Sequence, residues 1–161
     1  MAAKIVSFIL NGRQTEVLVQ PLTTLQTVLR EQLGFTGTKV GCKQGGCGSC
    51  TVMVEGQSML SCLLPIENVA AKNVTTLEGV TPLEGLHPIQ QAFFDNFATQ
   101  CGYCTPGMIM TSVALLDRNP NPTRAEIVEA LSGNICRCTG YEPIIRAVQD
   151  AARRMNGGKG E

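Results

Sequence analysis

Apolar and polar residues alternate through the first half of the chain, and this alternation predicts short β-strands. The run 4–10 is followed by Asn11-Gly12, a pair typical of a tight hairpin turn, and the next run should pair back on it. A helix capped by Thr23 or Thr24 is predicted to reach about Leu33, because apolar residues then recur at helical spacing. The predicted strands are residues 4–10, 15–20, 51–54, 57–61 and 74–77.

The second half carries the 3.6-residue period of amphipathic helices instead. Thr105 is predicted to cap a helix that Pro106 begins, and the box formed by Thr123 and Glu126 is another typical helix start. The predicted helices are residues 88–97, 105–116, 123–131 and 142–154. We therefore predict an α+β protein with two domains, residues 1–79 and 80–161, joined in a segment that contains Pro82.

Composition and charge exclude several classes of function. The 161 residues include 13 Lys plus Arg and 13 Asp plus Glu, so the formal net charge is zero and a basic nucleic-acid-binding surface is not expected. Apolar residues make up 43%, which argues against disorder. No apolar run approaches the length of a membrane span, and no export signal is recognised, so we expect a cytoplasmic protein without direct membrane insertion. It would be periplasmic only if a partner carried the signal.

The eight cysteines fall into two groups of four. Clustered cysteines in a reducing compartment more often bind metal than form disulfides. In the first group, Cys42, Cys47 and Cys50 follow the pattern Cys-x4-Cys-x2-Cys, and Cys62 follows after a further eleven residues. This is the spacing of plant-type [2Fe-2S] ferredoxins, and glycines between the cysteines let the backbone wrap a cluster. A structural zinc site would more commonly use two separate cysteine pairs.

The second group combines Cys-x2-Cys with Cys-x-Cys, formed by Cys101, Cys104, Cys136 and Cys138. Four thiolates in this arrangement suit an iron–sulfur cluster and a zinc ion about equally on chemistry alone. Cys104 and Cys138 come just before predicted helices, whose N-termini favour an anionic group. Arg137, between two of these cysteines, could offset the charge of a cluster or simply be solvated.

Three strings together resemble the small iron–sulfur subunit of the molybdenum hydroxylases, the xanthine oxidase and aldehyde oxidoreductase family. They are GCKQGGCGSCTV at 41–52, QCGYCTPG at 100–107 and NICRCTGY at 134–141. The resemblance implies a ferredoxin-like β-grasp domain that holds an outer [2Fe-2S] cluster on Cys42, Cys47, Cys50 and Cys62. It implies a four-helix bundle that holds an inner [2Fe-2S] cluster on Cys101, Cys104, Cys136 and Cys138.

The same resemblance implies partners. Gln100 and Cys138 would lie against a molybdopterin cofactor, with its molybdenum, on a large subunit. Electrons would pass from molybdenum through the inner and outer clusters to FAD on a flavin-binding subunit, or to haem on a cytochrome subunit. The substrate would be oxidised on the large subunit, so this chain needs no catalytic residue, and we interpret His87 as a helix-start residue.

Three other classes of protein remain as alternatives to this electron-transfer subunit. A free ferredoxin-like carrier would need only one cluster and a shorter chain. A zinc-stabilised interaction module would contain zinc and no labile sulfide. A disulfide scaffold is disfavoured because no export signal is recognised.

Overall fold

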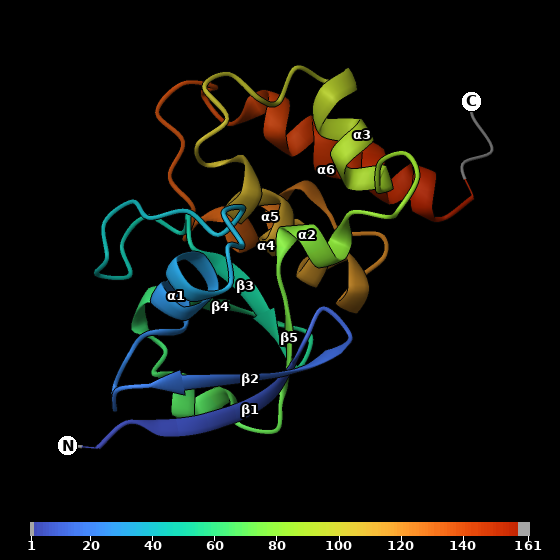
Figure 1. Ribbon diagram of the computed structural model, residues 1–161. Helices are drawn as coiled ribbons and strands as arrows, with labels where there is room; N and C mark the ends of the chain where they lie inside the picture. Colours follow the sequence, from blue (N-terminus) through green and yellow to red (C-terminus); the bar gives the residue numbers. More distant parts are fainter. Residues whose placement is uncertain (1, 158–161) are drawn as a thin grey trace.

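The computed structural model describes residues 2–157 and contains one five-stranded sheet, in the order β2-β1-β5-β3-β4 (Figure 1). β1 and β5 are parallel, and the other neighbouring strands are antiparallel. The strands are β1 Lys4–Leu10, β2 Arg13–Val19, β3 Thr51–Val54, β4 Gln57–Leu60 and β5 Asn73–Thr75.

The first hairpin forms as its sequence predicts. Asn11 and Gly12 both have positive φ, which is the conformation that a two-residue turn of this type requires. The turn sets a register in which Phe8 faces Thr15, and the side chain of Phe8 is completely buried. Burial of alternate residues of β1 and β2 therefore fixes which face of the hairpin packs on the core.

The helix predicted after β2 is present but irregular. Thr24 caps α1 (Leu25–Thr27) by accepting a hydrogen bond from the backbone N–H of Thr27. A π-helical segment, η1 (Val28–Gln32), continues the chain. Leu25, Val28 and Leu29 are fully buried against the strands, so this helical segment closes the core of the sheet.

Two short helical turns lie between β4 and β5, where no helix was predicted. η2 (Ser61–Leu63) follows β4, and η3 (Ile66–Val69) precedes β5. The prediction that a strand reaches Leu77 is wrong, because Leu77 begins α2 (Leu77–Val80). The short apolar run does not distinguish a strand end from a helix start.

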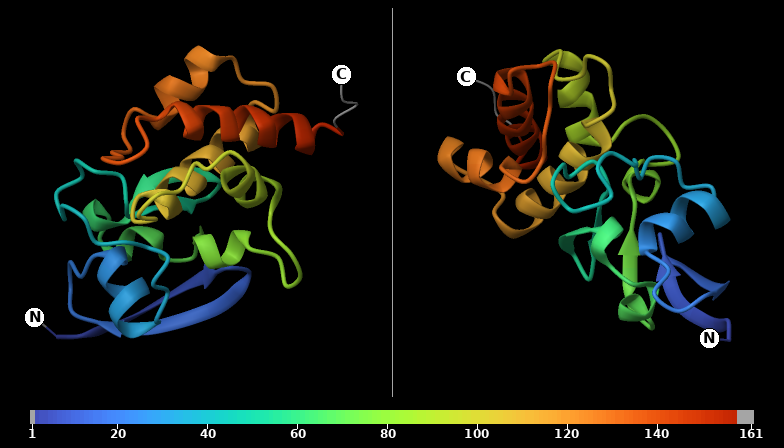
Figure 2. Two further views of the ribbon diagram at one scale, coloured as in Figure 1. Left: turned by 90° about the horizontal axis from the view of Figure 1, so that it is seen from above. Right: turned by 90° about the vertical axis from the view of Figure 1, so that its left-hand side faces the viewer.

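Four longer helices make up the second half: α3 (Pro88–Asp95), α4 (Thr105–Arg118), α5 (Arg124–Leu131) and α6 (Glu142–Met155). His87 is the N-cap of α3, and Thr123 forms the predicted capping box with Glu126 at α5. The prediction of Thr105 as a cap is wrong by one position, because Thr105 is the first residue of α4 and Cys104 is its N-cap. α3 and α6 lie side by side, on the side of the molecule away from β1 and β2 (Figures 1 and 2).

The buried side chains form two hydrophobic clusters, one in the sheet region (residues 4–75) and one in the helical region (residues 77–157). All four residues of β3 are buried, because α4 covers the strand (Figure 2). Met53 of β3 belongs to the helical cluster, where Met108 and Met110 are also buried, so these methionines are core residues. Within residues 2–157, no helix has the length and apolar character to cross a membrane.

Candidate cluster sites

The first set of thiols lies on the loop before β3 and on the turn after β4. The β3–β4 hairpin pairs Thr51 with Leu60, and this pairing brings Cys50 and Cys62 together. The hydroxyl of Ser61 donates a 2.8 Å hydrogen bond to the carbonyl of Cys50. Cys50 and Cys62 are buried, whereas Cys42 and Cys47 are partly exposed, so the loop carrying Cys42 forms the outer edge of this site.

Backbone amides turn toward the sulfur of Cys42. The N–H groups of Gln44 and Gly46 donate to its Sγ atom at 3.4 and 3.2 Å. These hydrogen bonds, that from Gln44 foremost, lower the pKa of the Cys42 thiol to about 7. The loop therefore stabilises negative charge on sulfur, as a thiolate ligand requires.

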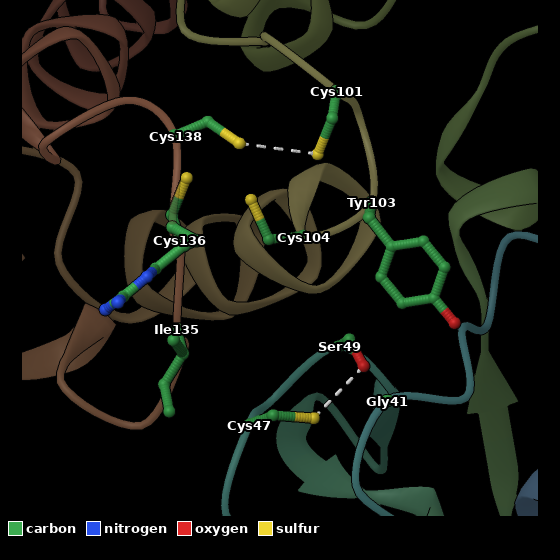
Figure 3. Close-up of a pocket in the computed structure, with 10 residues that line it drawn as sticks. Gly41, Cys47, Ser49, Cys101, Tyr103, Cys104, Ile135, Cys136 and Cys138 are labelled. Atoms are coloured by element: carbon green, nitrogen blue, oxygen red, sulfur yellow. Dashed lines mark hydrogen bonds between the residues drawn. The ribbon is translucent and has the colours of Figure 1, made fainter.

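The second set lies where α4 begins and on the loop before α6. The side chains of Cys101, Cys104, Cys136 and Cys138 point toward one another (Figure 3). The Sγ atoms of Cys138 and Cys101 are 3.7 Å apart, and the thiols of Cys104 and Cys136 contact each other. The fold thus gathers the four thiols of the second set, although residues 105–135 separate its two cysteine pairs along the chain.

The sulfurs of each set fall into two pairs. The pairs are Cys42 with Cys47, Cys50 with Cys62, Cys101 with Cys138, and Cys104 with Cys136. A [2Fe-2S] cluster needs this arrangement, because each of its two irons takes two thiolates. A zinc ion would instead need four thiolates around one centre.

Burial affects the protonation of one thiol at each site. Burial raises the pKa of the Cys50 thiol to about 11 and that of the Cys104 thiol to about 12. Both thiols would be protonated at neutral pH without a nearby cation, whereas a bound metal deprotonates a thiol outright. The residues present therefore fit two [2Fe-2S] clusters.

Hydrogen bonds connect the two cysteine loops directly. The backbone N–H of Ile135 donates to the carbonyl of Cys47 at 2.9 Å. The amide of Asn134 donates to the carbonyl of Gly48 at 3.0 Å and accepts from the hydroxyl of Thr111 at 2.9 Å. Asn134 is buried, so these contacts form a polar connection within the interface between the sheet and helical regions.

Tyr103 forms a second connection between the loops. Its hydroxyl donates to the carbonyl of Val40 at 2.5 Å, two residues before Cys42. Its ring points away from the second set of thiols and toward the loop that carries Gly41 (Figure 3). A cavity between the loops is lined from one side by Cys47 and Ser49 and from the other by the second set, with Arg137 also in its wall.

The thiols of the second set differ among themselves in exposure. Cys101 and Cys138 are exposed, whereas Cys104 is partly buried and Cys136 is buried. Gln100, predicted to contact the pterin, is also exposed beside Cys101. The second set therefore presents one pair of sulfurs to the surface and keeps the other pair inside.

Sequence reasoning identified the eight thiols but missed the residues that connect and surround them. Asn134, Ile135, Tyr103 and Thr139 all lie within the three strings, yet none was given a role. Each of these residues lies within two positions of a cysteine, which could have drawn attention to them. The hydrogen-bond partners of Asn134, Ile135 and Tyr103, however, lie far away along the chain.

Comparisons with known proteins agree with this geometry. A family model described as a 2Fe-2S iron-sulfur cluster binding domain matches residues 8–77, and one described as a [2Fe-2S] binding domain matches residues 76–149. The nicotinate dehydrogenase small FeS subunit of Eubacterium barkeri is 46% identical over 145 residues, which cover 90% of this chain and 92% of that protein.

Longer proteins and solved structures match as well. Aldehyde oxidoreductase of Megalodesulfovibrio gigas is 43% identical over 154 residues, covering 94% of this chain and 17% of that protein. A chain in the crystal structure of quinoline 2-oxidoreductase from Pseudomonas putida 86 superposes with a TM-score of 0.93 at 41% identity, covering 99% of this chain and 100% of that one.

Proposed function

Because the chain belongs to the small [2Fe-2S] subunits of the molybdenum hydroxylase family, we propose that it relays single electrons within a multi-subunit oxidoreductase. The electrons come from a molybdopterin centre on a large partner subunit and leave to FAD or haem on another subunit. When bound, each [2Fe-2S] cluster accepts and releases one electron at a time.

The hydrogen bond between Cys47 and Ile135 carries this proposal. Cys47 belongs to the first set of thiols, and Ile135 directly precedes Cys136 of the second set. This hydrogen bond connects the backbones of the two ligand loops directly, and together with the Asn134–Gly48 and Tyr103–Val40 hydrogen bonds it holds the two loops against each other. A free carrier with one cluster would need no such contact.

Exposure supports an order for the two sites. Cys101 and Cys138 are exposed next to Gln100, so we assign this face to the molybdopterin-bearing subunit. The loop of Cys42 is the outer edge of the first site, and we assign it to the side of the flavin or haem acceptor. The proposed ligands are Cys42, Cys47, Cys50 and Cys62 for the outer cluster and Cys101, Cys104, Cys136 and Cys138 for the inner cluster.

We also assign the sheet region to the β-grasp fold and the helical region to a four-helix bundle, as two domains. The strand order, with α1 and η1 covering the sheet, supports the first assignment. The separate hydrophobic cluster formed with α3, α4, α5 and α6 supports the second.

The substrate is not set by this chain. Relatives of similar identity, 41–46%, carry names that refer to nicotinate, aldehyde and quinoline. Under the proposal, substrate is oxidised on the large subunit.

The proposal is tested by the cofactor content of the complex purified through a tag on this chain. We expect four irons and four labile sulfides per chain, together with molybdenum and either flavin or haem. Zinc without labile sulfide would overturn the assignment of both sites. Iron and sulfide without any molybdenum-containing partner would instead leave a free two-cluster carrier.

A further inference from the structure

Thr139 follows the last cysteine of the second set, and its side chain is directed at one of the thiols. Its hydroxyl donates to the Sγ atom of Cys136 at 3.1 Å, and its backbone N–H lies 3.4 Å from the same sulfur. Within residues 2–157, this is the only hydroxyl that the structure hydrogen-bonds to a thiol of the second set. Cys136 is buried, so water does not compete freely for its sulfur.

The surroundings of Thr139 fix the direction of this hydrogen bond. The backbone N–H of Tyr141 donates to Thr139 Oγ1 at 3.2 Å, which leaves the hydroxyl hydrogen free to point at sulfur. The hydroxyl of Tyr141 in turn accepts a 3.0 Å hydrogen bond from the backbone N–H of Cys136. Tyr141 therefore positions both the donor and the residue that carries the acceptor.

A hydrogen bond to a ligating sulfur stabilises the more negative state of an iron–sulfur cluster. We propose that the Thr139 hydroxyl raises the reduction potential of the cluster held by Cys101, Cys104, Cys136 and Cys138. This inference rests on the proposed function. The step it affects is the transfer of one electron from the reduced molybdopterin centre to this cluster, in which no bond of the chain forms or breaks.

The test is an EPR-monitored redox titration of the purified complex with Thr139→Val, Thr139→Ala and Thr139→Ser. Valine and alanine remove the hydroxyl but keep the backbone N–H, and serine keeps both donors. A matched control is Thr105→Val. Thr105 adjoins Cys104, but its hydroxyl pairs with that of Thr99 at 3.3 Å.

We expect the valine and alanine variants to shift the midpoint of one cluster to a more negative potential. The ratio of reduced to oxidised cluster at the wild-type midpoint should fall on the order of five- to tenfold, a tenfold change being about 59 mV for one electron. Thr139→Ser and Thr105→Val should keep the wild-type midpoint, and the second cluster should not change in any variant.

Three outcomes would overturn the inference. The midpoint could stay unchanged in both valine and alanine variants, or serine could shift it as far as valine does. Loss of the cluster from both valine and alanine variants would show that the hydroxyl retains the cluster rather than setting its potential. Failure of the proposed function is distinguishable in the wild-type preparation, which would then lack either the two separate iron–sulfur signals or a molybdenum-containing partner.

Discussion

The backbone carbonyl of Cys47 accepts a 2.9 Å hydrogen bond from the backbone N–H of Ile135, although 88 positions separate the two residues. Both groups belong to the backbone, so side-chain replacement at either residue leaves the bond in place. The distance between the two cysteine loops therefore depends on how closely the sheet and helical regions pack.

Replacement of one cysteine in each set tests the division into two sites. We expect Cys47→Ser and Cys101→Ser each to abolish a different EPR signal of the reduced protein, because each removes a proposed ligand of one cluster only. Iron analysis of each variant supplies the control. Loss of both signals from one variant that stays folded would contradict the two-site partition.

Asn134→Ala should destabilise the contact between the two regions. The change removes the Asn134 donor from the carbonyl of Gly48, which keeps its hydrogen bond from the Thr51 hydroxyl, and leaves the hydroxyl of Thr111 without its buried acceptor, at a cost of about 2 kcal/mol. The midpoint of thermal unfolding of the cluster-loaded protein should fall by about 4–8 °C. The exposed Asn68 is a suitable control, and Asn68→Ala should change the midpoint little.

Gly107→Ala should also destabilise the protein, although alanine normally favours a helix over glycine. A Cβ atom at Gly107 would collide with the carbonyl oxygen of Gly48, so the backbones would have to separate. Overpacking of this kind costs about 1–3 kcal/mol. A Cβ atom at Gly133 would meet nothing within 4 Å, so Gly133→Ala should be tolerated in the same unfolding experiment.

His87 should make stability depend on pH. It caps α3 through Nδ1, and burial lowers its pKa from the ordinary value of 6.5, with Asp117 acting in the opposite direction. The unfolded chain then binds the proton more readily, so stability should fall as pH drops from about 7.5 to about 5.5.

His87→Asn keeps a capping acceptor and removes the titration. Because the chain contains one histidine, the pH dependence in this range should flatten in the variant. An unchanged pH profile in thermal unfolding would show that another group is responsible.

Local sequence signals predicted much of the fold. Asn11-Gly12 predicted the first hairpin, and Thr123 with Glu126 predicted the start of α5, because turns and caps depend on adjacent residues. The cysteine spacing predicted the second group of thiols, whose side chains point toward one another, whereas the ligand sets of the two clusters stay predictions. The pairing of Asn134 with Gly48 could not be predicted, since it connects residues 86 positions apart through packing. The cytoplasmic location and the role of Gln100 stay predictions.

The close approach of Gly48 to Gly107 limits how the two halves can be recombined with other proteins. A different ferredoxin grafted onto the helical region would need a glycine where Gly48 stands, because a Cβ atom there would collide with the carbonyl oxygen of Gly133. The helical region in turn accepts no side chain at Gly107. A chimera that joins the sheet region of one protein to the helical region of another should therefore fold only when both parent proteins have glycine at these two positions.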